Sequence, residues 1–572
     1  MAVHLADEGT PRQRWGSPLE FTITCIGYAV GLGNFWRFPY LCYTYGGGAF
    51  LLPYTIVLFT LGMPIFCMEL GIGQKYQIGA THAWTKIHPA FSGIGLAGVM
   101  ATFFVALYYN VIVGWALWFL ANSGANPLPW ANRANETDGA LRFWEVDTLR
   151  CRGTMASCSW ENVTDWGAAA AAGPSLFDTW GAVGSLVLCL AIGWFLIWLC
   201  VCKGIESLGK VAWVTAIFPY LVLVILLVRG LTLDGADIGL KFYLTPRFDQ
   251  LGNIKVWIAA ASQIFYSTGV GWGTLVAFAS YNDTRHNFVR DAWLVPLINC
   301  GTSFLAGLVV FSVLGFMAKQ ADLTVEDLRL QGSGLAFVAY PSALAQMPAA
   351  QLFSVLFFLM IICLGVDSQF AMVETVLTAL NDANVLPGLS KPKKSALVCT
   401  LMGLIGLVFV TRAGLHWLDL FDTFSVNVTL FIVGAFECIA VGWVYGADQF
   451  AADAERMTGR KLPRPLLWSI TFVIPPVLVL LSLWALIASI TAGYAFPPAG
   501  IVMGWILSLC SVFPLFFGLR KAASARTIYS SARARLKRIC SGQASRTKMP
   551  REITPADADV VGASQVDARV AL

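Results

Sequence analysis

Two apolar stretches of this sequence are interrupted by glycine-rich runs that carry neutral polar side chains. The first run extends from Gly31 to Asn34, and the second from Ser267 to Gly271. An interrupted helix frees N–H groups that can hold a carboxylate and carbonyl oxygens that can hold a hard cation. Asn34 and Ser267 add neutral side-chain oxygens of the kind that such a cation needs. The expected chemistry is therefore the binding of ions and a small anionic group.

The interrupted stretches belong to a chain that is too apolar for a soluble protein. Of its 572 residues, 57% are hydrophobic and 12% are charged, against ~25% charged in soluble domains. This composition excludes a disordered chain, a coiled coil and a nucleic-acid-binding protein, and the net charge of +5 is no sign of nucleic-acid partners. A helix that crosses a bilayer needs about 20 apolar residues. Twelve stretches meet this length: 20–42, 48–74, 96–122, 179–202, 211–229, 255–280, 290–318, 351–381, 395–411, 418–444, 466–491 and 498–519.

We therefore expect an all-α membrane protein with twelve transmembrane helices. The two glycine runs interrupt the first and the sixth of these helices. Glycine is also a common packing residue in membrane helices, which leaves a structural role open for either run alone. Unwound backbone at membrane depth, however, is tolerated only where it lines a cavity, and paired interruptions in matching halves indicate a transporter's binding site.

Positive charges predict which side of the membrane each loop faces. An even number of crossings places both termini on one side, and Lys and Arg near the crossings mark the cytoplasmic side. The C-terminal tail and four short loops, which contain Lys203, Arg285, Lys391 and Arg460, carry this charge. We expect a cytoplasmic N-terminal segment at 1–19 and a basic, disordered cytoplasmic tail at 521–572 that can meet regulatory partners. The expected location is the plasma membrane, with both termini cytoplasmic.

The longest loop on the opposite side, residues 123–178, has the features of an extracellular segment. Asn135 and Asn162 each begin an Asn-X-Thr motif for N-glycosylation. Cys151 and Cys158 lie in polar sequence, where an oxidising exterior allows a disulfide between them. The five histidines lie far apart and have no metal-ligand spacing.

Several blocks of the sequence resemble the neurotransmitter:sodium symporters. Gly27 to Tyr40 reads GYAVGLGNFWRFPY, and Gly46 to Tyr54 reads GGGAFLLPY. QIFYS at 263–267, ASYN at 279–282, NCGTS at 299–303 and LGVDSQ at 364–369 follow in the family's order. The resemblance covers roughly residues 12–520 and implies a transporter domain at 20–520. Its fold would be a 5+5 inverted repeat with helices 1 and 6 unwound at mid-membrane, with repeat one at 20–229, repeat two at 255–444 and extra helices at 466–519.

The resemblance implies two Na⁺ sites that are built from oxygen ligands. The first would use the Ala29 carbonyl, Asn34, Ser267, Asn299 and the substrate carboxylate, and the second the carbonyls of Gly27, Val30 and Leu364 with Asp367 and Ser368. A carboxylate at mid-membrane is costly unless it is paired, and a bound Na⁺ is the natural partner of Asp367. A hydrogen bond that packs two helices is the alternative role for this side chain.

A chloride site is implied by four neutral donors: Tyr54, Gln263, Ser267 and Ser303. Chloride-independent bacterial members of the family carry a carboxylate at the position of Ser303. Serine leaves the site one negative charge short, so Cl⁻ is expected to bind with Na⁺. The alternative is that Ser303 is only a small packing residue.

Two gates are also implied, an outer pair and an inner set: Arg37 with Asp422, and Arg12 with Asp382, Trp15 and Tyr281. In the family the outer pair closes the vestibule over the substrate. Either arginine could instead be an interfacial residue whose charged end reaches water. Glu69, in the second apolar stretch, is expected to be structural and to bond the backbone of the second interruption.

Gly31 bears most directly on the substrate. Monoamine members of the family carry an aspartate there that binds the substrate amine, whereas glycine leaves room for a carboxylate beside the Na⁺ held by Asn34. Tyr109 would donate its hydroxyl to that carboxylate. The expected substrate is therefore an amino acid or a close analogue.

Trp272 is expected to limit the size of the substrate. Glycine transporters also have tryptophan there, with a glycine three residues earlier, as Gly269 stands here. A large indole favours glycine, alanine or a methylated glycine, unless Trp272 faces a neighbouring helix. The predicted substrate lining is Ala29, Gly31, Leu32, Gly33, Val105, Tyr109, Tyr266, Ser267, Gly269, Trp272, Gln369 and Met372.

The sequence thus predicts a sodium- and chloride-coupled symporter, and not an enzyme, that takes up a small neutral, glycine-like amino acid by alternating access. Other substrates stay open: GABA, taurine, betaine or a larger neutral amino acid. GABA members share the Asp-Ser-Gln pattern that ends at Gln369. A non-transporting, receptor-like member of the same fold is the remaining alternative.

Overall fold

The computed structural model describes residues 12–132, 139–150, 182–328, 335–491, 496 and 498–521. Residues up to Ala525 form one compact unit, and the second unit, from Arg526 to Leu572, lies outside the described residues. The secondary structure of the described part is helical apart from two isolated bridges, Gly47 to Pro246 and Ala182 to Thr411. The predicted all-α fold class is confirmed.

Ten of the twelve predicted crossings are continuous helical stretches that are long and apolar enough to span a membrane. Crossings 2 to 5 cover Leu51–Tyr76, Pro89–Asn122, Gly184–Val201 and Ser207–Leu231. Crossings 7 to 12 cover Phe288–Ala321, Ala350–Asp382, Lys391–Val410, Gly414–Thr458, Arg464–Ile487 and Pro498–Gly518. Crossings 1 and 6 are absent from this set because their glycine runs divide each into shorter helices.

Most of the continuous crossings consist of one long α-helix, and several are joined from α-helical and short π- or 3-10-helical segments. The elements are α3 (Leu51–Val57), η2 (Leu58–Gly62), α4 (Met63–Tyr76), η3 (Pro89–Phe91), α6 (Ser92–Asn122), α9 (Gly184–Val201), α10 (Ile205–Leu231), α14 (Phe288–Ala321), α16 (Ala350–Asp382), α17 (Lys391–Gly406), η10 (Leu407–Val410), α18 (Gly414–Ser425), α19 (Asn427–Ile439), η11 (Ala440–Gly446), α20 (Ala447–Thr458), α21 (Arg464–Trp468), η12 (Ser469–Val473), α22 (Ile474–Thr491) and α23 (Pro498–Lys521). The loops add α5 (Ala80–Ile87), α7 (Gly139–Arg142), η4 (Phe143–Thr148), α11 (Ala236–Leu244), η7 (Phe248–Gly252), η8 (Val325–Leu328), η9 (Leu335–Ala339) and α15 (Tyr340–Ala345).

The first crossing is divided between α1 (Pro18–Ala29) and η1 (Gly33–Arg37), which continues into α2 (Phe38–Thr44). Val30 and Gly31 leave the helix, so the last carbonyls of α1 lack the partners of a continuous helix. The interruption is shorter than predicted, because Asn34 already belongs to η1. The Asn34 Oδ1 accepts the Gly31 N–H at 3.1 Å, which supports the backbone where it turns back into a helix.

The sixth crossing is divided between α12 (Ile254–Thr268) and α13 (Thr274–Ala279). Gly269, Gly271 and Gly273 have φ angles of +71°, +81° and +76°, a region that glycine adopts without strain. The unwound segment is therefore 269–273, two residues further along the chain than predicted. Ser267 still belongs to α12, because the left-handed backbone falls on the glycines.

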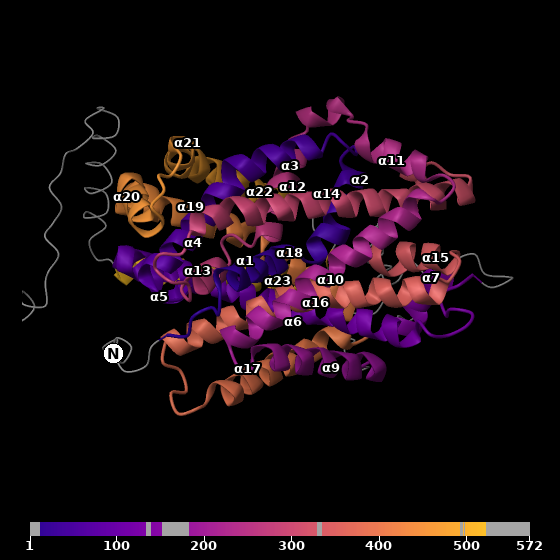
Figure 1. The fold of residues 1–572 in the computed structure, drawn as a ribbon, viewed down its shortest axis with the longest axis horizontal. Helices are drawn as coiled ribbons and strands as arrows, with labels where there is room; N and C mark the ends of the chain where they lie inside the picture. The colour runs from indigo at the N-terminus through magenta and orange to yellow at the C-terminus, as the bar shows by residue number, and fades with distance from the viewer. Residues whose placement is uncertain are drawn as a thin grey trace, which may run out of the picture. The chain divides into compact units, whose positions relative to one another are not determined.

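The interrupted helices lie among the long helices of the described unit. α1 packs against α10, α14 and α16, and it also contacts α12 and α13. Figure 1 shows α1 between α14 on one side and α16 and α6 on the other. The interruptions of crossings 1 and 6 are thus adjacent and enclosed, although residues 27–34 and 267–273 are far apart in the sequence.

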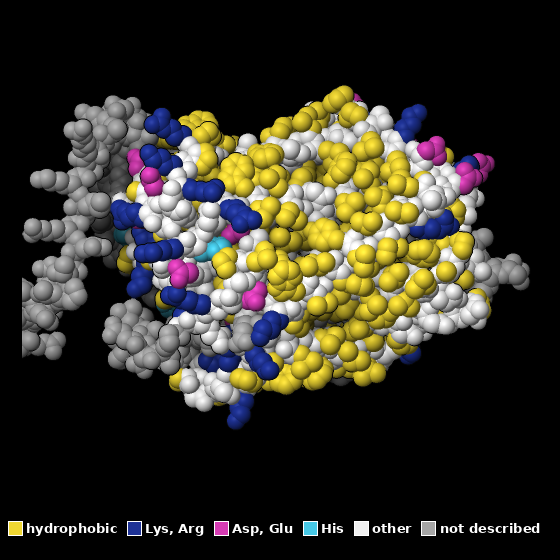
Figure 2. Space-filling view, viewed as in Figure 1, with side chains coloured by type: hydrophobic (Ala, Val, Ile, Leu, Met, Phe, Trp, Pro, Cys, Tyr) yellow, Lys and Arg dark blue, Asp and Glu magenta, His cyan; other side chains and the backbone are white. Residues whose placement is uncertain are grey.

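The surface of the described part has an apolar band and a basic end. Figure 2 shows hydrophobic side chains over the middle of the visible face, and Lys and Arg at the end that carries α5, α13 and α20. Side chains such as Val214 and Leu188 are 67% and 62% exposed. Such exposed apolar side chains suit contact with lipid, which accommodates apolar groups but offers no hydrogen bonds to the backbone.

Candidate functional site

The side chains of three predicted cation ligands meet where the two interruptions face α14. The Asn34 Nδ2 donates to the Asn299 Oδ1 at 2.6 Å and to the Asn299 carbonyl at 3.2 Å. The Ser267 Oγ lies 3.0 Å from the Asn299 Oδ1 and 2.8 Å from its Nδ2. All three side chains are buried. Neutral polar side chains from three different crossings therefore meet near Ala29, the last residue of α1, and the Asn34 Oδ1 is the atom that accepts the Gly31 N–H.

The second predicted cation set gathers around the carboxylate of Asp367 in α16. This side chain is 1% exposed. A Cβ added at Gly27 would lie 2.7 Å from the Asp367 Oδ2, so the absence of a side chain lets the α1 backbone approach the carboxylate. Asp367 also accepts a hydrogen bond from the Thr215 hydroxyl of α10. Sequence reasoning missed Thr215, whose only signal is a hydroxyl within an apolar crossing.

The other members of this set lie on the same two helices. The Ser368 Oγ donates to the Tyr28 carbonyl at 3.2 Å, one of the α1 carbonyls released by the interruption. Val30 follows α1 directly, and Leu364 lies one turn before Ser368 in α16. The arrangement joins one buried carboxylate, one hydroxyl and the end of a helix, which is a suitable environment for a hard cation.

The predicted anion ligands adjoin the first cation set. The Tyr54 hydroxyl lies 3.2 Å from the Ser303 Oγ, and the Ser303 Oγ accepts from the Asn34 Nδ2 at 2.8 Å. The Gln263 Nε2 donates to the Gly33 carbonyl at 3.1 Å, while its Oε1 is buried and has no hydrogen-bond partner among the described residues. Because Asn34 contacts both sets, a charge placed at Ser303 would act directly on the cation ligands.

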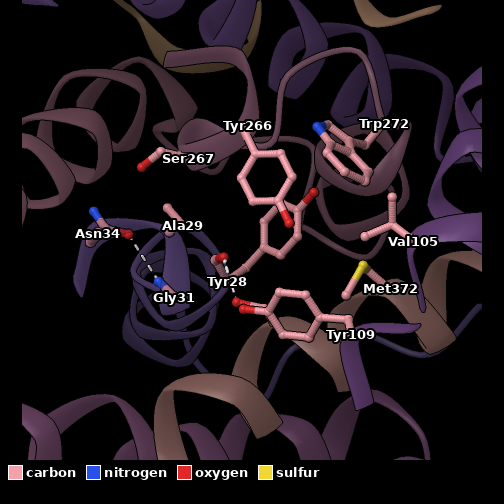
Figure 3. A pocket seen from close by; sticks show the side chains of 12 residues that line it. Tyr28, Ala29, Gly31, Asn34, Val105, Tyr109, Tyr266, Ser267, Trp272 and Met372 are labelled. Atoms are coloured by element: carbon pink, nitrogen blue, oxygen red, sulfur yellow. Dashed lines mark hydrogen bonds between the residues drawn. The ribbon is translucent and has the colours of Figure 1, made fainter. Parts of the chain in front are cut away.

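A cavity of about 30 Å³ opens beside these side chains, which is more than one water molecule needs. Nine of the twelve predicted substrate residues line it: Ala29, Gly31, Gly33, Val105, Tyr109, Tyr266, Ser267, Trp272 and Met372. Figure 3 shows Asn34, Gly31 and Ser267 at one end, and Trp272, Val105 and Met372 at the other. The cavity therefore has a polar end and an apolar end.

Three predicted substrate residues are absent from this lining. The Leu32 N–H donates to the Tyr109 hydroxyl at 3.3 Å, but the Leu32 side chain is buried elsewhere. The Gln369 Nε2 donates to the Ala106 carbonyl at 2.9 Å, which ties α16 to α6. Gly269 packs on a ring, since a Cβ there would collide with Tyr28.

The lining also includes Asn34 and Ser368, which were predicted as ion ligands, and Tyr28, which was not predicted at all. Tyr28 is the second-last residue of α1 before the first interruption, and its position in the GYAVG block was a signal that could have identified it. Its ring is packed edge-on against Phe278 of α13, with 6.1 Å between the ring centroids. Tyr28 thus connects the two interrupted crossings at the wall of the cavity.

Gly31 has no room for a side chain. A Cβ built there would lie 2.5 Å from the Ser368 Oγ and 3.0 Å from the Tyr109 hydroxyl. Real Cβ atoms essentially never approach another heavy atom closer than 3.0 Å. A carboxylate side chain at position 31 would therefore require Ser368 or Tyr109 to move.

The predicted inner-gate residues come together. Arg12 donates to the Asp382 Oδ1 at 2.9 Å and to the Ser280 Oγ at 2.8 Å, and its guanidinium lies 4.5 Å from the centre of the Tyr281 ring. The Trp15 indole N–H donates to the Phe278 carbonyl at 3.0 Å. These contacts fasten the N-terminal segment to α13 and α16.

The predicted outer-gate residues do not pair with each other in the described structure. The Arg37 Nη2 donates to the Ser262 Oγ at 3.3 Å, and its guanidinium lies 4.6 Å from the centre of the Tyr266 ring. The Asp422 Oδ1 instead accepts from the Tyr108 hydroxyl at 2.7 Å. The inner contacts are therefore formed, while the outer ion pair is not.

Glu69 occupies the structural position that was expected. It is fully buried in α4, and its Oε1 accepts the Gly271 N–H of the unwound segment at 2.7 Å. Four predicted positions in the loop 123–178 lie outside the described residues: Asn135, Cys151, Cys158 and Asn162. Nearly all of the predicted tail, from 522 onwards, also lies outside them.

Comparison with known proteins decides the family. The sequence model described as the Sodium:neurotransmitter symporter family matches residues 12–523, a range that includes every residue that the structure describes. The chain belongs to this family. The symporter is therefore a membrane transporter and not an enzyme, and the resemblance drawn from the sequence blocks is confirmed.

Relatives of the symporter carry different substrate names. It is 40% identical over 534 residues to the sodium- and chloride-dependent taurine transporter of Bos taurus, covering 90% of this chain and 86% of the relative. It is 39% identical over 530 residues to the creatine transporter of Torpedo marmorata, covering 89% and 85%. It is 38% identical over 538 residues to the sodium- and chloride-dependent neutral and basic amino acid transporter B(0+) of Mus musculus, covering 88% and 84%. These names indicate a sodium- and chloride-dependent family and several substrates.

Proposed function

We propose that this symporter carries a small amino acid, of the size of glycine or alanine, whose carboxylate lies at Gly31. The crowding of Gly31 by Ser368 and Tyr109 carries this proposal. Gly31 supplies no side-chain carboxylate to bind an amine, and one could enter only if Ser368 or Tyr109 moved, so the anionic group of the site would come from the substrate. The Tyr109 hydroxyl accepts the Leu32 N–H, which leaves its proton available to the substrate carboxylate.

Trp272 supports a small substrate because its indole bounds the apolar end of the cavity. The side chain is 3% exposed and packs edge-on against Tyr266, with 5.7 Å between the ring centroids. The Thr102 hydroxyl donates to the Trp272 carbonyl at 2.8 Å, which anchors this part of the unwound segment to α6. A substrate side chain larger than a methyl group would meet the indole. The taurine and creatine names of the relatives make those compounds necessary members of any substrate test.

The ion-binding part of the proposal follows from the two oxygen-rich sets. One Na⁺ would share the substrate carboxylate with the carbonyl of Ala29 and the side chains of Asn34, Ser267 and Asn299. A second Na⁺ would neutralise Asp367, which otherwise places a charge inside the membrane. The donors Tyr54, Gln263, Ser267 and Ser303 would hold Cl⁻ next to the first Na⁺. Binding would therefore be cooperative, since each anion reduces the cost of bringing a cation into a dry site.

The transport step would be alternating access. The Arg12–Asp382 contacts would close the inner side, and the outer gate would be open while Arg37 and Asp422 have other partners. Substrate and ions would enter from the outside, Arg37 and Asp422 would pair, and the Arg12 contacts would then break. A membrane potential of 100 mV supplies ~2.3 kcal/mol for each charge moved inward.

The orientation would follow the distribution of charge. The basic end in Figure 2, which is rich in Lys and Arg, supports a cytoplasmic position for that end, and both termini would lie in the cytoplasm. The loop 123–178 would face the exterior of the plasma membrane, with glycans at Asn135 and Asn162 and a disulfide between Cys151 and Cys158. The tail would be available to regulatory partners in the cytoplasm.

Substrate-evoked current in a voltage-clamped cell tests the function. The panel is glycine, alanine, leucine, proline, betaine, GABA, taurine and creatine, applied before and after Na⁺ or Cl⁻ is replaced. Currents for glycine and alanine that vanish without Na⁺ are expected. A response confined to GABA, taurine or creatine would refute the pocket assignment but not the family. Binding of an amino acid without uptake or current, at normal surface amount, would indicate a receptor-like member.

A further inference from the structure

The Tyr108 hydroxyl of α6 donates a hydrogen bond to the Asp422 carboxylate, which forms no ion pair with Arg37 among the described residues. The Tyr108 oxygen lies 2.7 Å from the Asp422 Oδ1, and the Tyr108 side chain is 1% exposed. A hydrogen bond from a hydroxyl to a carboxylate is among the stronger kinds of hydrogen bond, and this one is partly buried. Asp422 thus has a firm partner that is not its expected ion-pair partner.

Arg37 has a matching pair of neutral partners. Its Nη2 donates to Ser262, and its guanidinium rests on the Tyr266 ring at 4.6 Å from the ring centre. The Tyr266 hydroxyl is close enough to Tyr108, Arg37 and Asp422 to interact electrostatically with all three. Both charged residues of the outer gate are therefore stabilised while they are apart.

We propose that Tyr108 is a positioning residue of the outer gate, which stabilises the open gate by competing with Arg37 for the Asp422 carboxylate. Closure then exchanges neutral contacts for an ion pair, and the Tyr108 hydroxyl sets the balance between the two states. This inference rests on the proposed gate role of Arg37 and Asp422. It adds to that role a residue that touches neither ions nor substrate, although its neighbour Tyr109 lines the cavity.

The test measures access to the cavity from outside without any substrate. Val105 lines the cavity, is 1% exposed and lies one turn before Tyr109 on α6, so Val105→Cys reports an open outer path. Intact cells in Na⁺ medium receive a permanently charged thiol reagent, and mass spectrometry follows the modification of residue 105 over time. Adding Tyr108→Phe is expected to slow this modification about tenfold, the order of effect of one lost hydrogen bond to a charged group.

Two further variants separate the gate from general packing. Tyr340→Phe removes the same atom from another buried tyrosine, whose hydroxyl has no hydrogen-bond partner among the described residues, and should leave the rate unchanged. Asp422→Asn added to Tyr108→Phe removes the ion pair that closes the gate, and should restore fast modification.

The inference fails if Tyr108→Phe leaves the rate unchanged or raises it, if Tyr340→Phe slows it equally, or if the Val105→Cys protein itself is not modified. Failure of the proposed function is a separate result, namely modification at residue 105 in a protein that gives no current with any compound of the panel.

Discussion

Replacing Gly31 with alanine tests the substrate pocket most directly. The added Cβ would lie 2.5 Å from the Ser368 Oγ and 3.0 Å from the Tyr109 hydroxyl. The Ser368 hydroxyl must then rotate away and release the Tyr28 carbonyl, which it now bonds at 3.2 Å. Overpacking of this kind costs ~1–3 kcal/mol, and every ~1.4 kcal/mol is a tenfold change in affinity. If the cost falls on the bound state, apparent affinity should fall between about fivefold and a hundredfold.

The assay is the concentration dependence of the glycine-evoked current, with surface amount measured in the same cells. Gly301→Ala is the matched control, because no heavy atom lies within 4 Å of a Cβ built at that position. It should leave the half-saturating glycine concentration unchanged. An equal, small effect of both variants would show that residue 31 does not face Ser368 and Tyr109 in the working protein, and the reasoning from Gly31 to a carboxylate-bearing substrate would be lost.

Four other outcomes are expected. Ser303→Glu should give substrate-evoked current without Cl⁻, because the new carboxylate would lie next to Asn34. Its attraction to a Na⁺ about 4 Å away is ~4 kcal/mol at an effective dielectric constant of 20. An unchanged need for Cl⁻ in chloride-replacement recordings would remove Ser303 from the anion site. Asp367→Asn should abolish Na⁺-coupled uptake at normal surface amount, since the amide keeps the size and removes the charge; uptake that still depends on Na⁺ in the same way would exclude Asp367 as a ligand. Trp272→Leu should admit larger amino acids such as leucine in the current panel, and an unaltered substrate profile would mean that the indole does not limit the pocket. Glu145 lies in a loop outside the crossings, where burial raises its pKa to about 6 from 4.5; the folded protein therefore binds this proton more tightly than the unfolded chain, and its stability falls as pH rises from about 4.5 to 6. Glu145→Gln should raise the melting temperature of the purified protein at pH 7 but not at pH 4. An equal shift of the melting temperature at both pH values would contradict the argument.

The sequence alone determined the class of the protein and the places where its helices break. Hydropathy predicted twelve crossings, ten of which are continuous spans in the described residues, because a helix in lipid must be apolar over the thickness of the bilayer. The glycines near residues 31 and 269 marked both interruptions, since left-handed backbone and close contacts admit few other residues. The signature blocks around them indicated the family, which the comparison confirmed. The detailed repeat boundaries, the orientation and the outer loop stay predictions.

The tertiary structure decided which side chains meet. Asn34 contacts Asn299 from 265 residues away, and Thr215 contacts Asp367 from 152 residues away. Such contacts depend on how neighbouring helices are rotated and shifted, and a uniformly apolar crossing carries no pattern that reveals its rotation. For the same reason the sequence placed Gln369 in the substrate lining, whereas the structure turns it to the α6 backbone. The state of the gates also belongs to the tertiary structure, because Arg37 and Asp422 each have alternative partners on other helices, and the packing selects among them.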